Sequence, residues 1–155
     1  MKKFLSLRVI KAVTALTGLL LLTACAQPDF YDTEGNGYQL SDFEGQYRVI
    51  NYWATWCAPC IKEIPELIEL DENHDNIVVF GVNFDAPEPE EMTRQIERMK
   101  ITFPVYQYDP WQRLGIDKPE VLPTTVIVDP SGQVIDTLIG PQTEASLLAA
   151  MGLPE

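Results

Sequence analysis

The chain has 155 residues, of which 46% are hydrophobic and 10% aromatic, a composition that suits one folded domain and argues against a disordered chain. Its 11 basic and 23 acidic residues give a net charge of −12 at pH 7. Because nucleic acids and anionic lipid surfaces are bound through clustered lysine and arginine, this balance argues against nucleic acid as a partner and against docking on lipid through a basic patch.

The first 24 residues are typical of a bacterial secretory signal. Four basic residues precede an apolar run over residues 12–22, and no acidic residue occurs before Asp29. A positively charged start followed by a short apolar run is the pattern of a cleaved signal peptide. The alternative is a retained membrane-spanning helix, which needs roughly 20 apolar residues, whereas this run is shorter and contains polar threonines.

The apolar run ends in LTAC, Leu22 to Cys25, which resembles the lipobox of bacterial lipoproteins. In that motif the cysteine is lipidated, and several acyl chains hold a protein firmly on a membrane surface. The resemblance implies an extracytoplasmic protein anchored to a bacterial membrane, with an anchor and tether over residues 25–37 and a folded domain over 38–155. The alternative is ordinary secretion with a free Cys25. Cleavage before Cys25 would leave seven basic residues against 23 acids, a side-chain charge of −16.

The rest of the chain is predicted to consist of strands that alternate with helices. In chain order, we expect a buried strand over residues 47–54, a helix over 58–70, a second buried strand over 76–84, a helix over 88–100, a short strand over 103–108, a helical turn that stops at Gly115, a hairpin that turns at 129–132 and a last helix over 143–151. This order predicts an α/β fold with a central mixed β-sheet flanked by helices.

The helix over residues 58–70 carries a recognisable apolar stripe. Ile61, Ile64 and Ile68 fall on one face, so we expect this face to be the buried one, while Lys62 falls away from it. Pro65 lies in the helix interior and is expected to bend the helix, because a proline there removes a hydrogen bond and clashes with the preceding turn.

Cys57 and Cys60 stand two residues apart where the strand over 47–54 gives way to the helix. The unpaired N–H groups and the macrodipole at a helix start stabilise a thiolate, which lowers the pKa of Cys57 and makes it a nucleophile. Cys60 follows about one turn later, where it can attack a mixed disulfide formed at Cys57 and release the partner. Trp56 would shield the pair on one side; the alternative is that this tryptophan is an ordinary packing residue. The placement indicates redox chemistry.

Two other roles are open to this cysteine pair. A zinc site usually takes four Cys or His ligands, and the mature chain adds only Cys25 and His74, which lies in the acidic stretch DENHDN and is expected to be a solvated surface residue. A structural disulfide between residues three apart closes a very small loop and removes little unfolded-state entropy. Redox chemistry explains the placement at a helix start better than either.

Two blocks, NYWATWCAPCIKEIPEL at residues 51–67 and VLPTTVIVDPSG at residues 121–132, resemble the thioredoxin superfamily and, within it, the membrane-anchored TlpA/ResA-like branch. The resemblance implies a thioredoxin-like fold with the helix-and-strand insertion of that branch. It also implies a cis proline at Pro123, with Leu122 and Thr124 beside it facing the dithiol. Such a loop exposes backbone groups that can pair with an extended segment of a substrate.

The same resemblance draws attention to Glu63. Thioredoxins carry a buried aspartate six residues before the first cysteine, and the residue there is Asn51, which cannot ionise. The TlpA/ResA-like branch shares this feature and carries a glutamate three residues after the second cysteine, matching Glu63. We hypothesise that partial desolvation raises the pKa of Glu63 and that its carboxyl group moves a proton at Cys60. The alternative is an ordinary acid on the helix surface.

As a function, the resemblance implies an extracytoplasmic protein-disulfide reductase. Cys57 would attack a substrate disulfide, such as that of the haem-attachment cysteines of an apocytochrome c, and Cys60 would resolve the mixed disulfide. A transmembrane electron-donor protein would then re-reduce the pair, with no organic cofactor or metal required, and the protein is expected to be a monomer. An oxidant stays open, because the residues between the cysteines do not fix a reduction potential.

A peroxidase and a copper-binding module are the remaining alternatives. Peroxiredoxins carry the pattern Pro-x-x-x-Thr-x-x-Cys, whereas the corresponding positions before Cys57 are Ile50 and Ala54. A copper chaperone could use the two thiolates, but copper-handling relatives usually add a histidine later in the fold, and none follows His74.

Overall fold

The computed structural model describes residues 27–154. The expected signal peptide over residues 1–24 and the expected lipidation site Cys25 therefore lie outside the described residues. Within residues 27–154, no helix is both long enough and apolar enough to cross a membrane.

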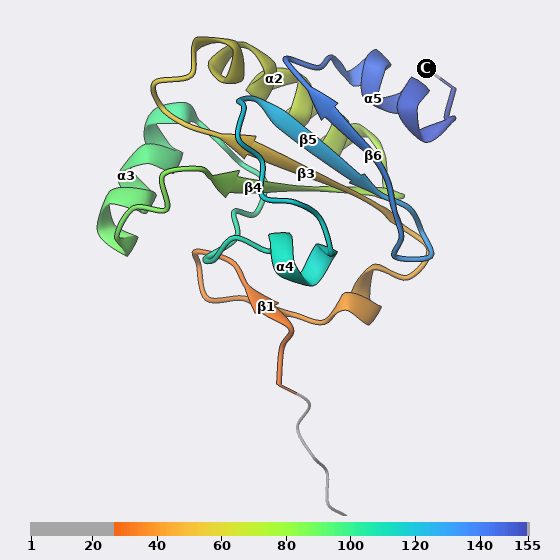
Figure 1. The fold of residues 1–155 in the computed structure, drawn as a ribbon, viewed down its shortest axis with the longest axis horizontal. Coiled ribbons are helices and arrows are strands. Elements are labelled where there is room, and N and C mark those ends of the chain that lie inside the picture. The colour runs from red at the N-terminus through yellow and green to blue at the C-terminus, as the bar shows by residue number, and fades with distance from the viewer. Residues whose placement is uncertain (1–26, 155) are drawn as a thin grey trace, which may run out of the picture.

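A four-stranded mixed β-sheet forms the centre of the domain (Figure 1). Its strand order is β4-β3-β5-β6, with bounds of Tyr47–Trp53 for β3, Ile77–Asn83 for β4, Thr124–Val128 for β5 and Val134–Ile139 for β6. β3 is parallel to β4 and antiparallel to β5, and β5 is antiparallel to β6. β3, β4 and β5 are rich in β-branched and aromatic residues, which suit strands that are buried on both faces. The predicted α/β fold with a mixed sheet is confirmed.

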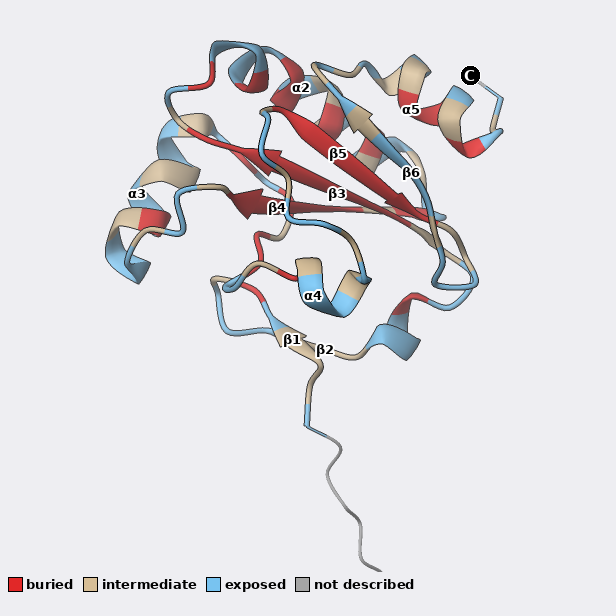
Figure 2. Ribbon diagram, in the orientation of Figure 1, coloured by how far each residue is buried: buried red, intermediate tan, exposed pale blue. Residues whose placement is uncertain are grey.

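Helices cover one face of this sheet, and shorter elements cover the other (Figures 1 and 2). The first face packs against α2 (Ala58–Asn73), α3 (Pro89–Met99) and α5 (Glu144–Met151). The second face packs against β1 (Phe30–Tyr31), β2 (Gly37–Tyr38), the short helix η1 (Leu40–Phe43) and α4 (Trp111–Leu114). Figure 2 shows β3, β4 and β5 buried between the two layers. The sheet therefore has an apolar core on each side.

Local capping explains where several elements begin and end. Thr143 caps α5 by accepting a hydrogen bond from the backbone of Ser146, so the last helix starts at the predicted position. α3 begins at Pro89, whose missing N–H costs nothing in a first turn, and it ends before Lys100. Gly115 adopts a left-handed conformation that stops α4, as the sequence predicts.

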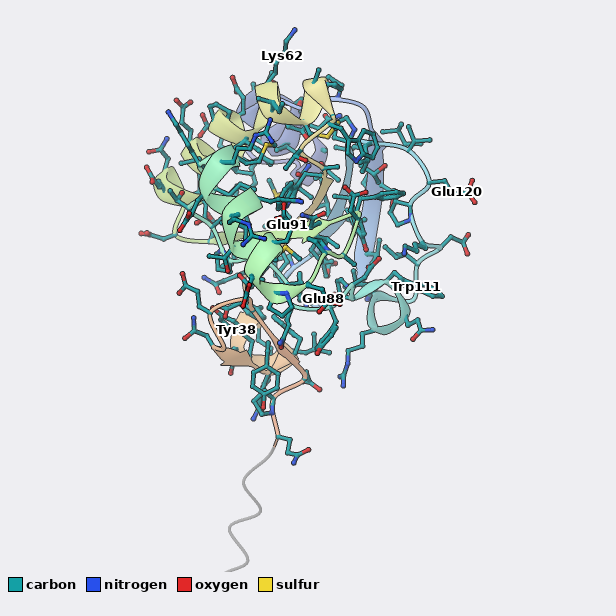
Figure 3. All side chains as sticks on the ribbon, turned by 90° about the vertical axis from the view of Figure 1, so that its left-hand side faces the viewer. Tyr38, Lys62, Glu88, Glu91, Trp111 and Glu120 are labelled. Atoms are coloured by element: carbon teal, nitrogen blue, oxygen red, sulfur yellow. A yellow bond between two sulfur atoms is a disulfide. The ribbon has the colours of Figure 1, made fainter. Side chains whose placement is uncertain are left out.

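The buried face of α2 differs from the predicted one. Ile64 is buried as expected, but Ile61 is 49% exposed and Ile68 is only partly covered. The face that packs on the sheet contains Cys60, Glu63, Ile64, Leu67 and Leu70. These positions follow the helical repeat, but two of them are not aliphatic, so a search for isoleucines selects a neighbouring stripe. Figure 3 shows Lys62 pointing away from the domain, as predicted.

The prediction of a short strand over residues 103–108 is wrong. Only single bridges form there, Val105 with Gly81 in parallel and Tyr106 with Asp32 in antiparallel orientation. Pro104 lacks an N–H, so this segment cannot form a continuous ladder with β4. The segment nevertheless lies along β4, because Gly81 donates to the Pro104 carbonyl and accepts from the Tyr106 N–H.

The tether predicted up to residue 37 is also different in the structure. β1 and β2 form a short antiparallel hairpin that packs on the sheet. The Phe30 ring lies 5.2 Å from that of Tyr38, 5.6 Å from that of Phe80 and 4.6 Å from that of Tyr106. These aromatic contacts bury apolar surface, so the folded domain begins before the predicted boundary at residue 38.

Candidate active site

Cys57 occupies the point where β3 has ended and α2 is about to begin. It is the residue that caps α2, and its Sγ accepts a hydrogen bond from the backbone N–H of Cys60 at 3.3 Å. Pro59 lies in the first turn of the helix. A sulfur that accepts an N–H at a helix start is in the environment that favours a thiolate, so the local geometry suits Cys57 as the nucleophile.

The two cysteines form a disulfide, with their Cα atoms 5.3 Å apart. Cys57 is 4% exposed, whereas Cys60 is completely buried. A partner can therefore reach Cys57 more readily than Cys60. This asymmetry matches the predicted roles, in which Cys57 meets the substrate and Cys60 acts from within.

Glu63 lies on the buried face of α2, one turn after Cys60. Its side chain is 2% exposed, so the alternative that it is an ordinary surface acid is wrong. Its Oε1 accepts from Asn51 Nδ2 at 2.8 Å, and its Oε2 accepts from the backbone N–H of Gln142 at 2.9 Å. Burial raises the pKa of the Glu63 carboxyl, and these two hydrogen bonds oppose that rise only in part.

Asn51 connects this acid to the sheet. It lies in β3 and is completely buried, and its Nδ2 donates both to Glu63 and to Thr125 Oγ1, at 3.0 Å. Thr125 sits directly opposite Asn51 in the antiparallel register of β5. Among the described residues, no partner is found for the Asn51 Oδ1 atom. A polar network therefore runs from β5 through β3 to α2, where it ends on the helix face that carries Cys60.

The peptide bond between Leu122 and Pro123 is cis, which confirms the prediction for Pro123. The Pro123 carbonyl accepts from the backbone N–H of Gly140, at 2.9 Å. Leu122 is half-buried and contacts both apolar cores. Thr124 is buried, and its hydroxyl donates to the Val121 carbonyl at 2.7 Å, so this hydroxyl is already engaged. That Leu122 and Thr124 face the dithiol, and that this loop pairs with a substrate, stay predictions.

Two residues near this loop and the dithiol were not singled out from the sequence. Val121, next to the cis-proline loop, is 52% exposed, and its only signal is its place beside the proline. Asp85 accepts from Trp56 Nε1 at 2.9 Å, which fixes a tryptophan side chain that is 63% exposed. The Trp56 ring also meets Phe84 edge to face, 6.3 Å apart. Trp56 is thus an oriented apolar surface next to Cys57 rather than a core residue.

The single histidine lies in a different place from the one expected. His74 was predicted to be solvated, but its Nε2 lies 2.8 Å from Glu144 Oε1, where the end of α2 meets the start of α5. In residues 27–154, no group of three or more His, Cys, Asp or Glu side chains is arranged to hold a metal ion.

Comparison with known proteins extends this picture. The family model described as the AhpC/TSA family matches residues 22–137. The thiol-disulfide oxidoreductase ResA of Bacillus cereus is 32% identical over 117 residues, which cover 75% of this chain and 68% of that protein. The thiol:disulfide interchange protein HelX of Rhodobacter capsulatus is 33% identical over 102 residues, covering 65% of this chain and 56% of HelX.

Solved structures show the same fold. The crystal structure of StoA from Bacillus subtilis superimposes with a TM-score of 0.62 at 23% identity, covering 78% of this chain and 92% of StoA. A secreted thiol-disulfide isomerase from Corynebacterium glutamicum gives a TM-score of 0.67 at 25% identity, covering 81% of this chain and 82% of that one. The predicted thioredoxin-like fold is confirmed by these structures.

Proposed function

We propose that this chain, which belongs to the AhpC/TSA family, reduces disulfides of other proteins outside the cytoplasm. Its similarity to ResA makes it a ResA-like thiol–disulfide oxidoreductase. The observation that carries the proposal is the asymmetry of the pair, with Cys57 at the helix start and Cys60 fully buried behind it. A buried acid lies one turn further along the same helix face.

The reaction begins with the reduced pair. The Cys57 thiolate attacks one sulfur of the substrate disulfide, a mixed disulfide forms, and the other substrate sulfur leaves as a thiolate. Cys60 then loses its proton and attacks the Cys57 sulfur, which releases the second substrate thiolate. The substrate gains two electrons, and Cys57 and Cys60 end as the disulfide that the structure contains. An external dithiol must return two electrons to complete the cycle.

Glu63 is proposed to accept the proton that Cys60 loses. The support is its burial on the same helix face and the raised pKa of its carboxyl, which brings a carboxylate closer in basicity to a thiol. The pH dependence of Cys57 alkylation, measured in the wild type and in Glu63→Gln, tests this role. A profile that shifts in Glu63→Gln but not in Glu69→Gln, an exposed acid of the same helix, supports it. Unchanged profiles in both variants would contradict the proposed role of Glu63.

The cellular setting is part of the proposal. We infer a signal peptide over residues 1–24, acylation of Cys25 and a transmembrane protein that supplies electrons, with an apocytochrome c as substrate. The mass of the protein purified from membranes tests the anchor, because a Cys25 N-terminus bearing acyl chains is heavier than the unmodified chain. A Cys25→Ser variant that stays in the membrane fraction would contradict it.

The exchange reaction itself is tested with a peptide containing one disulfide. The reduced wild type should reduce it, Cys57→Ser should be inactive, and Cys60→Ser should accumulate a mixed disulfide visible by mass. Equal activity of Cys57→Ser and wild type would contradict the proposal.

The peroxidase alternative gains no support, because buried Ile50 and Ala54 stand where that chemistry takes a proline and a threonine.

A further inference from the structure

Arg48 places a charge in the core at the far end of β3 from the dithiol. It is the second residue of the strand, five residues before Trp53, which corresponds to roughly 16 Å along an extended chain. The side chain shares a face of the strand with Ile50 and Tyr52 and enters the apolar core that contains Phe43. The residue is only 4% exposed.

Few contacts within the protein compensate the buried charge of the Arg48 guanidinium. Its Nε and Nη1 atoms are buried and find no hydrogen-bond partner in the described part of the chain. None of the ion pairs within residues 27–154 involves Arg48. Its Cζ lies 5.6 Å from the Phe43 ring centroid, a cation–π contact that offsets only a part of the lost hydration. Arginine cannot lose its proton in a protein, so the charge itself persists.

Asp129, the acid whose charge acts on Arg48, forms no ion pair with it. Asp129 exerts an attraction on it, but Asp129 Oδ1 accepts from the backbone N–H groups of Ser131 and Gln133 and from the Ser131 hydroxyl. These bonds hold the carboxylate in its own turn. Burial lowers the pKa of the Arg48 guanidinium, and Tyr106 and Asp129 act against this effect. A buried cation without a close counter-ion is destabilising, and a bound anion would offset this cost.

Arg48 lines a cavity of about 300 Å³ between η1 and the turn that joins β5 to β6. Its lining also includes Ser41 and Ser131 and the apolar residues Phe43 and Pro130. Gly132 lies over the Arg48 side chain, since a Cβ atom at Gly132 would stand 3.7 Å from Nη2. The volume falls at the lower end of the range of about 300–1,000 Å³ typical of small-molecule sites.

We propose that this cavity binds a small organic monocarboxylate, whose carboxylate pairs with Arg48 and whose apolar body lies against Phe43 and Pro130. A single negative charge is favoured over a divalent oxyanion, because Glu44 also lines the cavity and the chain as a whole carries a charge of −12. The apolar walls favour an anion with a hydrocarbon portion over an inorganic one. The site is separate from the dithiol, so it stands whether or not the proposed reductase activity does.

Butanoate is the probe, titrated into the folded chain at constant ionic strength and followed by backbone amide NMR. We expect saturable shifts centred on Ser41, Ser131 and Gly132. Arg48→Met should weaken binding by about tenfold or more, whereas Arg94→Met, which removes the same charge from an exposed helix surface, should leave it unchanged. Glu44→Gln should tighten binding, because a repelling charge is removed from the cavity wall.

Four results would overturn the proposal. These are shifts that never saturate, shifts that centre on the dithiol, equal binding to wild type and Arg48→Met, and tighter binding of sulfate than of butanoate. If Arg48→Met does not fold, the direction of the Glu44→Gln effect and the map of shifted amides in the wild type still decide the question. Peptide-disulfide reduction, measured in the same samples, reports on the reductase separately.

Discussion

Asn51 Nδ2 lies 2.8 Å from Glu63 Oε1, and this hydrogen bond joins the strand that precedes the dithiol to the helix that carries it. Both side chains are buried. The contact holds a carboxyl group on the same face of α2 as Cys60, where burial raises the pKa of that carboxyl group. The stability of the fold therefore depends on whether Glu63 is ionised. In the proposed mechanism, the same carboxyl group accepts the proton that Cys60 loses.

The first prediction concerns the pH dependence of stability. The pKa of Glu63 is raised from 4.5 in the folded protein, so the folded state binds this proton more tightly than the unfolded state does. The stability from this group is thus complete below pH 4.5 and is lost as the pH rises through the folded pKa. As the pH rises through this range, the free energy of unfolding measured with urea should fall less in Glu63→Gln than in wild type. In Glu69→Gln, an exposed control, it should fall as much as in wild type.

Replacing Asn51 tests the network from its other end. Asn51→Ala removes the donor to Glu63 Oε1 and to Thr125 Oγ1, so we expect a loss of about 1–3 kcal/mol in the free energy of unfolding. Loss of the Asn51 hydrogen bond should also raise the pKa of Glu63 further, since this bond lowers it. Thr125→Val removes only one of the two contacts and should cost less. Equal stability of Asn51→Ala and wild type would contradict the assigned hydrogen bonds.

Phe30 tests where the folded domain begins. Its ring is partly buried among Tyr38, Phe80 and Tyr106, so Phe30→Ala should lower the free energy of unfolding by about 2–3 kcal/mol, somewhat less than for a fully buried phenylalanine. Its strand neighbour Tyr31 is exposed, and Tyr31→Ala should cost at most about 0.5 kcal/mol. If Phe30→Ala lowered the free energy of unfolding no more than Tyr31→Ala does, the residues before 38 would not be part of the folded domain.

Trp56 tests the surface beside the dithiol. Trp56→Ala should lower kcat/KM for a protein disulfide by at least about fivefold, or ~1 kcal/mol, because an exposed, oriented tryptophan is a strong contact for a partner. The rate with a small aromatic disulfide should change little. Ile135→Ala, an exposed apolar residue near the other end of the sheet, is the control. A parallel loss with both substrates would mean that Trp56 acts on the dithiol and not on recognition.

Much of the site was predictable because it depends on local order along the chain. A strand, two cysteines and a helix follow each other without interruption, so the placement of Cys57 at the helix start can be read from residues 47–70 alone. The cis bond at Pro123 came from resemblance. Arg48 was not singled out from the sequence, although it is a lone cation within a strand expected to be buried.

The parts that were missed depend on contacts between distant residues. The partners of Glu63 come from β3 and from Gln142, 79 residues later, and only the sheet register and the packing of α5 bring them together. The hairpin at Phe30 looks like a tether because it has no apolar period, and it is ordered by aromatic rings far along the chain. Local propensity does not contain this information.

The reduction potential of the Cys57–Cys60 pair tests the central claim most directly. The chain from Ala26 onward would be equilibrated with dithiol buffers of known potential, and its free thiols would be counted by mass. A reductant requires a value near that of thioredoxin, about −270 mV, or lower, and this is the predicted result. A value near −120 mV, typical of strong oxidants, would contradict the proposed direction, and a pair that never forms the disulfide would contradict the exchange mechanism itself.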